Sequence, residues 1–225
     1  ICNLTDKPNI IKGLKEAGIV KSYSIAPITS TKNDNSMDFG IIIHWGLYSV
    51  PAYDDVSSAK RRNIMNGSEW YLKRLTESGK FRPVSGHEQT KHYHSENFPD
   101  YEYKNFEKDF TLDDWDCDEW MKLFKSTGAT YVVITAKHHD GYCLWDTKTT
   151  DFNSVKSGPH IDIIAQIKKC AEANGLKFGI YYSWLEFEHG CTIDYMKNIV
   201  IPQVTELLSY KPFLIHKYKN LPLRV

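Results

Sequence analysis

The sequence lacks three features that would each have pointed to a particular class of protein. Its five cysteines include no Cys-x-x-Cys pair, which argues against a zinc site or a thioredoxin-type redox site. The 28 lysines and arginines balance the 28 aspartates and glutamates, so no overall positive charge attracts nucleic acid or an anionic membrane surface. No run of eighteen apolar residues occurs, so we expect no membrane-spanning helix.

What the chain does contain is a series of short apolar runs separated by helical patterns. The runs are unbroken rather than alternating, which is typical of strands buried on both faces, and they occupy residues 39–43, 131–135, 177–182 and 212–215. Helical patterns lie at residues 69–78, 118–126, 161–174 and 193–210. The segment 81–110 reads as a long polar loop. Because strands alternate with helices, the sequence predicts an α/β fold with a parallel sheet.

Histidine, tryptophan or tyrosine side chains lie at the end of each of the first three predicted strands. His44-Trp45-Gly46 comes directly after the first run, and Lys137-His138-His139-Asp140-Gly141 comes just after the second. The third run ends at Tyr181-Tyr182, which Ser183-Trp184 follows. In parallel α/β folds the ligand site lies at the carboxyl ends of the strands. A structural role, such as a buried histidine bonded to a backbone carbonyl, would explain one of these clusters. It explains poorly why three successive strands each carry one. We therefore expect these side chains to form one site.

The residue types at this edge suit a neutral ligand that is rich in hydroxyl groups. Imidazole and phenol groups donate and accept hydrogen bonds, and aromatic faces pack on the apolar side of a sugar ring. The alternative is a metal site made by the histidines, but His138 and His139, if extended, would point in opposite directions. The sequence therefore favours a sugar site without a metal or another cofactor, and it assigns His92 and His94 to the surface of the polar loop.

Several of these segments resemble the alpha-L-fucosidases, a family of retaining glycoside hydrolases built on a (β/α)8 barrel. The strongest similarity lies in residues 128–145, which contain the Lys-His-His-Asp-Gly motif. Residues 39–51, with the His-Trp-Gly motif, resemble the opening strand of the family, residues 69–71 the segment after it, and residues 175–183 its third strand. These motifs occur in the family's order over residues 38–215. The resemblance implies a partial (β/α)8 TIM-like barrel, about the first four βα units.

The resemblance also implies which residues bind substrate. In the family, fucose hydroxyls are held by the histidine of His-Trp-Gly, the tryptophan of Glu-Trp-Tyr, both histidines of Lys-His-His-Asp-Gly and a tyrosine ending the third strand. The matching positions hold His44, Trp70, His138, His139 and Tyr182. The choice of Tyr182 over Tyr181 rests on the alternation of side chains along the strand. The implied partner is a fucosylated glycan, with neither nucleic acid nor membrane.

The two catalytic carboxylates of the family have no counterpart that we identify in this chain. The family's nucleophile is an aspartate just past the fourth strand and its acid/base lies further on, but no Asp or Glu follows Glu206 here. We therefore expect a truncated form of a retaining fucosidase. A shift of reading frame after Ile215, or an alternative end to the gene model, would explain the truncation. A catalytically inactive fucose-binding remnant, or pseudoenzyme, is the alternative. Asp140, Glu186 and Glu188 lie near strand ends but receive no catalytic role.

The same resemblance sets the expected domain organisation. Residues 1–37 form an irregular N-terminal segment, and residues 38–225 form an incomplete (β/α)8 glycosidase catalytic domain. An incomplete barrel has two open sheet edges and an exposed apolar face, so we expect this polypeptide, when expressed alone, to be unstable or to self-associate. A lysosomal or secreted location is implied by the family resemblance alone.

Overall fold

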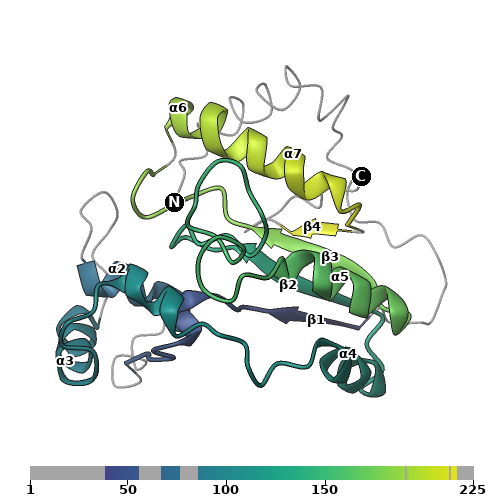
Figure 1. The fold of residues 1–225 in the computed structure, drawn as a ribbon, viewed down its shortest axis with the longest axis horizontal. Coiled ribbons are helices and arrows are strands. Elements are labelled where there is room, and N and C mark those ends of the chain that lie inside the picture. The colour runs from purple at the N-terminus through teal and green to yellow at the C-terminus, as the bar shows by residue number, and fades with distance from the viewer. Residues whose placement is uncertain (1–38, 56–66, 77–85, 191, 213, 217–225) are drawn as a thin grey trace.

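The fold is built around a parallel sheet of four strands in the order β1-β2-β3-β4 (Figure 1). The computed structural model describes residues 39–55, 67–76, 86–190, 192–212 and 214–216. The strands are β1 (Gly40–Ile43), β2 (Tyr131–Lys137), β3 (Lys177–Tyr182) and β4 (Leu214–His216). The helices are α2 (Tyr71–Thr76), α3 (His87–Asn97), α4 (Cys117–Ser126), α5 (Ile163–Ala173), α6 (Ile193–Tyr195) and α7 (Ile201–Ser209).

The predicted elements agree with the structure except in the segment between residues 81 and 110. The four strands lie in the four apolar runs, and α2, α4, α5 and α7 lie in the predicted helical segments. The predicted polar loop is wrong, because it contains α3 and a 3-10 helix, Tyr103–Lys108. No apolar periodicity signals α3, since the residues it buries are His87, Thr90 and His94. Residues 1–37, predicted to be irregular, lie outside the described residues.

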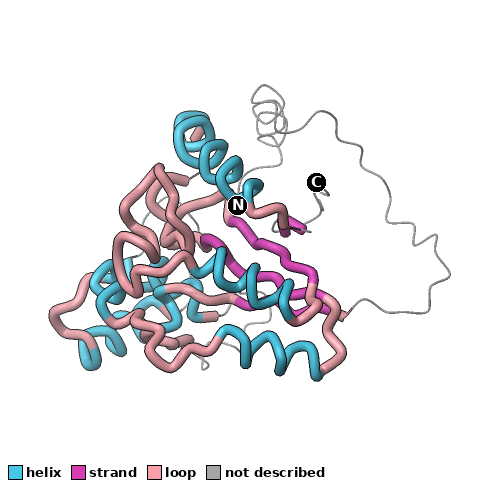
Figure 2. The backbone as a smooth tube through the Cα atoms, turned by 45° about the vertical axis from the view of Figure 1, so that its right-hand side comes forward, coloured by secondary structure: helices cyan, strands magenta, loops and turns pink. Residues whose placement is uncertain are grey.

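A capping side chain and a glycine set the two ends of α5, the helix between β2 and β3. The helix begins after Asp162, whose side chain accepts the backbone N–H of Ala165 at 2.8 Å. The chain reverses after the helix at Gly175, whose φ of +67° is a left-handed conformation that glycine adopts without strain. As a result α5 lies against β2 and β3 (Figure 1). The long loops that follow β2 and β3 gather at the carboxyl ends of the strands (Figure 2).

Side chains of the central strands alternate between a hydrophobic core and the opposite face of the sheet. Val132 and Ile134 of β2 belong to the core that includes α5. Thr135 points the other way, with its Oγ1 3.3 Å from the hydroxyl of Tyr48. Tyr181 of β3 pairs in register with Thr135 and therefore shares its face. This second face leads to the carboxyl ends of the strands.

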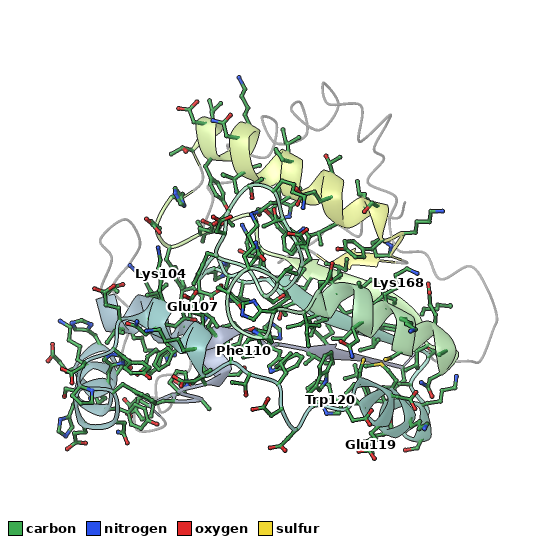
Figure 3. The ribbon with its side chains drawn as sticks, viewed as in Figure 1. Lys104, Glu107, Phe110, Glu119, Trp120 and Lys168 are labelled. Carbon is green, nitrogen blue, oxygen red and sulfur yellow. The ribbon has the colours of Figure 1, made fainter. Side chains whose placement is uncertain are left out.

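Trp45 fixes the direction of the chain at the end of β1. Its ring centroid lies 5.5 Å from that of Phe110, 5.1 Å from Trp115 and 5.0 Å from Trp120, and Figure 3 shows Phe110 beside β1 and Trp120 at α4. Its backbone N–H also donates to Thr135 Oγ1 at 3.0 Å. Because neighbouring residues point to opposite sides, packing Trp45 among these rings directs His44 to the other face.

The described part of the chain has no helix that is both long enough and apolar enough to cross a bilayer.

Removing the cap of α5 tests this account of the fold. Asp162 also accepts the hydroxyl of Tyr210 at 2.5 Å, so it ties α5 to the end of α7. We expect Asp162→Ala to lower the free energy of unfolding by about 1–2 kcal/mol, as measured by chemical denaturation. Asp162→Asn keeps an acceptor oxygen and is the matched control. An alanine variant as stable as the asparagine variant would contradict the capping role.

Candidate functional site

Three rings from three successive strands meet at the carboxyl edge of the sheet. The centroid of the His44 ring lies 5.6 Å from the centroids of both His138 and Tyr181. His138 stacks on Tyr181 at 5.6 Å with an angle of 15° between the ring planes. Tyr48 lies on a further side of His138, at 5.8 Å. His138 and Tyr181 are buried whereas His44 is exposed, so the cluster is open on the side of His44.

His139 extends this cluster toward Trp70. Its ring centroid lies 4.3 Å from that of His138 and 5.3 Å from that of Trp70. Phe187, from the loop after β3, packs against His139 at 5.4 Å and against Trp70 at 5.3 Å. Four of the five predicted residues are thus brought together. We call the assembled group the rim cluster and define it as His44, Trp70, His138, His139 and Tyr181.

Burial keeps the two central histidines neutral near pH 7. It lowers the pKa of His138 well below its usual value, and the neighbouring His139 and His44 act in the same direction. Burial also lowers the pKa of His139 to about 4. A neutral imidazole both donates and accepts one hydrogen bond. Nδ1 of His138 is buried and has no hydrogen-bond partner among the described residues, so it is an atom that a bound ligand could satisfy.

The structure does not bring Tyr182, the fifth predicted residue, into the rim cluster. Its hydroxyl donates to Oε1 of Gln203 on α7 at 2.6 Å, and its ring belongs to the hydrophobic core. Tyr181 lies beside His44 and His138 instead. Alternation requires that only one of two neighbouring tyrosines faces the site, but two tyrosines in a row do not reveal which one.

The carboxylates near the rim cluster are engaged in internal contacts. Oδ2 of Asp140 accepts the hydroxyl of Tyr103 at 2.7 Å, and burial raises the pKa of Asp140 to about 6. Glu186 accepts the ammonium of Lys137 at 2.6 Å, and its other oxygen lies 2.8 Å from Nδ1 of His189. Burial alone would raise the pKa of Glu186, but Lys137, Tyr195 and His189 together outweigh burial, so the pKa is lowered. Both carboxylates are thus hydrogen-bonded to other side chains of the protein.

The histidines do not form a metal site in the part of the chain that is described. No group of three or more His, Cys, Asp or Glu side chains there could hold a metal ion. The rings of His138 and His139 nevertheless lie side by side, contrary to our expectation, because both residues follow the end of β2 rather than continuing it. His94 is not a surface residue either, since α3 buries it with Nδ1 2.8 Å from the Tyr71 hydroxyl. His92 is exposed, as predicted.

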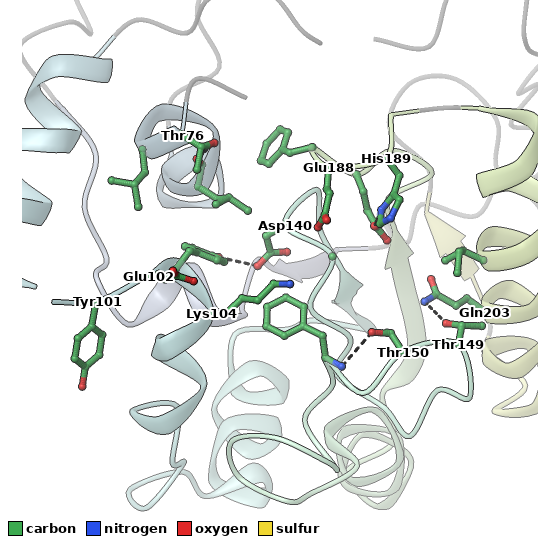
Figure 4. Close-up of a pocket in the computed structure, with 18 of the residues that line it drawn as sticks. Thr76, Tyr101, Glu102, Lys104, Asp140, Thr149, Thr150, Glu188, His189 and Gln203 are labelled. Atoms are coloured by element: carbon green, nitrogen blue, oxygen red, sulfur yellow. Dashed lines mark hydrogen bonds and ion pairs between the residues drawn. The ribbon is translucent and has the colours of Figure 1, made fainter. Parts of the chain in front are cut away.

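A hollow of about 840 Å³ lies next to the rim cluster (Figure 4). Its lining comes from α2, the 3-10 helix after α3, the loops after β2 and β3, and α7. Figure 4 shows Asp140, Lys104 and Glu188 around it, and Glu188 is exposed. The described residues that line the hollow do not include those of the rim cluster. The hollow and the rim cluster are therefore neighbouring features rather than one site.

Comparison with known proteins relates this arrangement to one family. The family model described as alpha-L-fucosidase matches residues 25–224. The chain belongs to the alpha-L-fucosidase family. The rim cluster of this fucosidase-family chain therefore lies in the segment that the family model covers.

Curated fucosidases show how far the similarity extends. The alpha-L-fucosidase of Dictyostelium discoideum is 31% identical over 222 residues, which cover 92% of this chain and 45% of that protein. The tissue alpha-L-fucosidase of Bos taurus is 33% identical over 79% of this chain and 36% of that protein. The chain thus spans less than half the length of these two fucosidases.

Solved fucosidase structures share the fold. The alpha-fucosidase of Thermotoga maritima is 36% identical and superposes with a TM-score of 0.65, over 83% of this chain and 45% of that chain. The same enzyme in complex with fucose gives a TM-score of 0.64 at 36% identity, over 83% of this chain and 46% of that chain. The α/β class predicted for this fucosidase-family chain is thereby confirmed.

Sequence reasoning missed three residues at this fucosidase-family site. Tyr48 lies in a short 3-10 helix directly after the His-Trp-Gly motif, so its closeness to the motif was the available signal. Tyr181 adjoins the predicted Tyr182, and only the register of β3 against β2 selects it. Phe187 had no signal, because an aromatic residue in a loop after a strand is equally typical of the core.

The opposed pKa shifts of His139 and Asp140 predict a specific response to acid. His139 has a pKa of about 6.5 in the unfolded chain and about 4 in the folded chain. Between these two pH values the unfolded chain binds a proton that the folded chain does not, so acid destabilises the fold through His139. Asp140 acts oppositely, because the folded chain protonates it near pH 6 and the unfolded chain only near pH 3.8. In wild type the two effects largely cancel between pH 6.5 and pH 4.

Asp140→Asn removes only the second of these effects. Between pH 6.5 and pH 4, the variant should lose about 3 kcal/mol more of its free energy of unfolding than wild type does. Urea denaturation at several pH values measures this difference. His139→Gln is the opposite control, and over the same range it should lose less of its free energy of unfolding than wild type does. Parallel pH profiles for wild type and Asp140→Asn would contradict the raised pKa of Asp140.

Proposed function

We propose that this chain carries the fucose-binding part of a retaining alpha-L-fucosidase and that the rim cluster binds the sugar. The observation that carries the proposal is the buried Nδ1 of His138, which has no partner among the described residues and lies beside the exposed ring of His44. A fucose hydroxyl supplies the missing hydrogen bond. Neutral imidazoles suit this task, since a hydroxyl group both donates and accepts.

The aromatic members of the rim cluster serve the apolar side of the sugar. Trp70 is partly exposed and packs on Phe187 and His139, so its ring is held rigidly with one part open. Fucose is a 6-deoxy sugar, and an aromatic ring is a favourable surface for its methyl group and C–H bonds. Tyr181 takes the role that we first assigned to Tyr182, because it lies beside His44 and His138. The Thermotoga maritima structure with fucose supports this choice of ligand.

The reaction of such an enzyme requires two carboxyl groups that the rim cluster does not contain. In retaining hydrolysis a carboxylate attacks the anomeric carbon to form a fucosyl-enzyme, while a carboxylic acid protonates the departing oxygen. That second group then activates water, which releases fucose. The two groups stand about 5–5.5 Å apart in such enzymes. Asp140 and Glu186 are held by Tyr103 and Lys137, so the catalytic pair comes from outside the described residues.

A separation between the sugar-binding residues and the catalytic carboxyl groups is compatible with a partial (β/α)8 barrel, which is the architecture that we propose. Four parallel strands with crossover helices supply one part of such a barrel, and the remaining βα units supply the rest. A pseudoenzyme that binds fucose without hydrolysing it has the same rim cluster. The two readings differ in whether the rest of the barrel brings the carboxylates.

Binding and turnover assays test the proposed function. Titration of L-fucose into the 225-residue chain, followed by calorimetry, should show binding. His138→Ala should weaken that binding by roughly tenfold or more, the effect of losing about 1.4 kcal/mol of hydrogen bonding. His92→Ala alters an exposed histidine on α3 and is the matched control, with unchanged affinity expected.

The same samples show where the catalytic carboxylates lie. With an aryl alpha-L-fucoside, the chain alone should bind the substrate but release no phenol, with or without a chelator. Turnover by the chain alone would contradict this expectation, because it would show that the chain itself holds the catalytic pair. Failure of L-fucose to bind to a folded sample would overturn the sugar site itself.

The open edges of the sheet predict that the chain self-associates. Within the described residues, β1 and β4 each pair with a single strand, and Phe39 and Ile42 beside the β1 edge are 50% and 48% exposed. Exposed apolar strand edges pair with other chains. Sedimentation velocity at increasing protein concentration should therefore show a rising average mass. A monodisperse monomer that melts cooperatively at all concentrations would contradict this prediction.

A further inference from the structure

Two oxygen atoms of the loop after β3 hold the Nδ1 side of the His139 ring. Nδ1 lies 2.6 Å from Oγ of Ser183 and 3.3 Å from the carbonyl oxygen of Leu185. The Ser183 hydroxyl donates its single hydrogen to that same carbonyl at 2.7 Å. Both oxygens therefore offer only lone pairs to His139. With the serine hydrogen placed in that way, the hydrogen in the two contacts of His139 belongs to Nδ1.

A hydrogen on Nδ1 fixes the state of the opposite nitrogen. A neutral imidazole carries one N–H, so Nε2 is then a bare acceptor. His139 is neutral near pH 7 because burial lowers its pKa to about 4. The ring is also held in place, since Trp70 and Phe187 pack against it at 5.3 and 5.4 Å. His139 thus presents a fixed acceptor rather than a group that donates.

A buried ion pair anchors the loop that sets this tautomer. The side chain of Lys137 is fully buried, and its Nζ lies 2.6 Å from Oε1 of Glu186. It also donates to the hydroxyl of Tyr195 at 2.6 Å, and that hydroxyl donates to the same Glu186 oxygen at 2.9 Å. The three groups form a closed triangle that joins the end of β2 to α6. Backbone bonds follow the same path, from Ser183 N–H to the Lys137 carbonyl at 3.0 Å.

Gly141 gives the carboxylate of Glu186 the room that this triangle needs. A Cβ atom at position 141 would lie 3.3 Å from Cδ of Glu186 and 3.4 Å from its Oε2. The φ of Gly141 is +86°, in the left-handed region that glycine adopts without strain. The turn that follows the two histidines is therefore shaped to admit the loop that holds His139.

From these contacts we infer that Lys137, Glu186 and Ser183 are positioning residues, which hold His139 as its Nδ1–H tautomer so that Nε2 accepts a hydrogen bond from a ligand hydroxyl. The inference rests on the proposed function only in naming that hydroxyl as one of fucose. Lys137 also acts through its charge, which disfavours a second positive charge on His139. Burying an ammonium group is costly even when it is paired. A role in holding His139 gives a functional reason for a lysine as fully buried as Lys137.

The charge on His139 responds to groups on every element around it. Lys137 stands at the end of β2 and His44 follows β1, and both disfavour the imidazolium form. His138 and Asp140 flank His139 on its own turn, and Glu186 stands on the facing loop. Charge variants can therefore separate an electrostatic role from a purely structural one.

NMR of the 15N-histidine-labelled chain measures the tautomer and the pKa of His139 directly. The signals are assigned by their loss in His139→Gln. At pH 7 and without any sugar, we expect Nδ1 to be protonated and Nε2 to be bare. An Nε2–H tautomer, or an imidazolium at pH 7, would overturn the inference.

Two single variants should move the pKa of His139 in opposite directions. Lys137→Met leaves the Glu186 carboxylate unbalanced and should raise that pKa, whereas Glu186→Gln leaves the ammonium unbalanced and should lower it. Lys137→Arg keeps the charge and should restore the wild-type value. Lys156→Met breaks an exposed ion pair with Asp151 and is the matched control, with no shift expected. Shifts in one common direction would show a structural role only.

A double variant covers the case in which either single variant fails to fold. Breaking a buried ion pair is strongly destabilising, but replacing both partners with apolar residues is often neutral. Lys137→Met/Glu186→Leu should therefore fold. The charge of Lys137 acts on the pKa of His139 more strongly than that of Glu186, so the double variant should still raise this pKa, by less than Lys137→Met does. An unchanged pKa would overturn the role of Lys137. If the tautomer is as expected and L-fucose does not bind, the proposed function fails and the positioning role stands.

Discussion

The site depends on the register of three parallel strands. Ile43 of β1 pairs with Ile134 of β2, and Thr135 pairs with Tyr181 of β3, so the three strands end close together along one edge. Since the side-chain period of a strand is two, a slip of one residue would exchange Tyr181 for its neighbour and turn the site inside out. Trp45, packed against other aromatic rings, holds β1 in the register that keeps His44 on the correct face.

Burial then determines the chemistry of the side chains that the register brings together. It keeps His138 and His139 uncharged, so they offer directed hydrogen bonds instead of a positive field. Lys137 is buried as well, but Glu186 and Tyr195 satisfy it, and the triangle that they form braces the loop against His139. A neutral, braced and partly open group of rings suits a neutral ligand with many hydroxyl groups.

The sequence predicted those parts of the fold and the site that depend on local patterns. Four apolar runs gave four strands. The motifs after the first two runs gave His44, His138 and His139, and the family resemblance gave Trp70; the structure brings these four residues together. Helix α3 escaped prediction because the side that it buries is polar, with His94 bonded to Tyr71 rather than packed in an apolar stripe. Such a contact joins residues far apart in the sequence, so no periodic pattern within the segment predicts the helix.

The choice between two tyrosines failed for a related reason. Alternation along β3 is a local rule, but its phase is set by pairing with β2, which the sequence does not display. The side-by-side rings of His138 and His139 also depend on where β2 ends, since the two residues lie beyond it. Prediction therefore reached the residue types of the site but not the phase and the turn that orient them.

A crystal structure of the chain with bound L-fucose tests the central claim most directly. The account predicts that the sugar lies on the rim cluster, with hydroxyls within hydrogen-bond distance of His44, His138 Nδ1 and His139 Nε2 and an apolar face against Trp70. Density for fucose in the neighbouring hollow near Lys104 and Glu188, with the rim cluster empty, would contradict it.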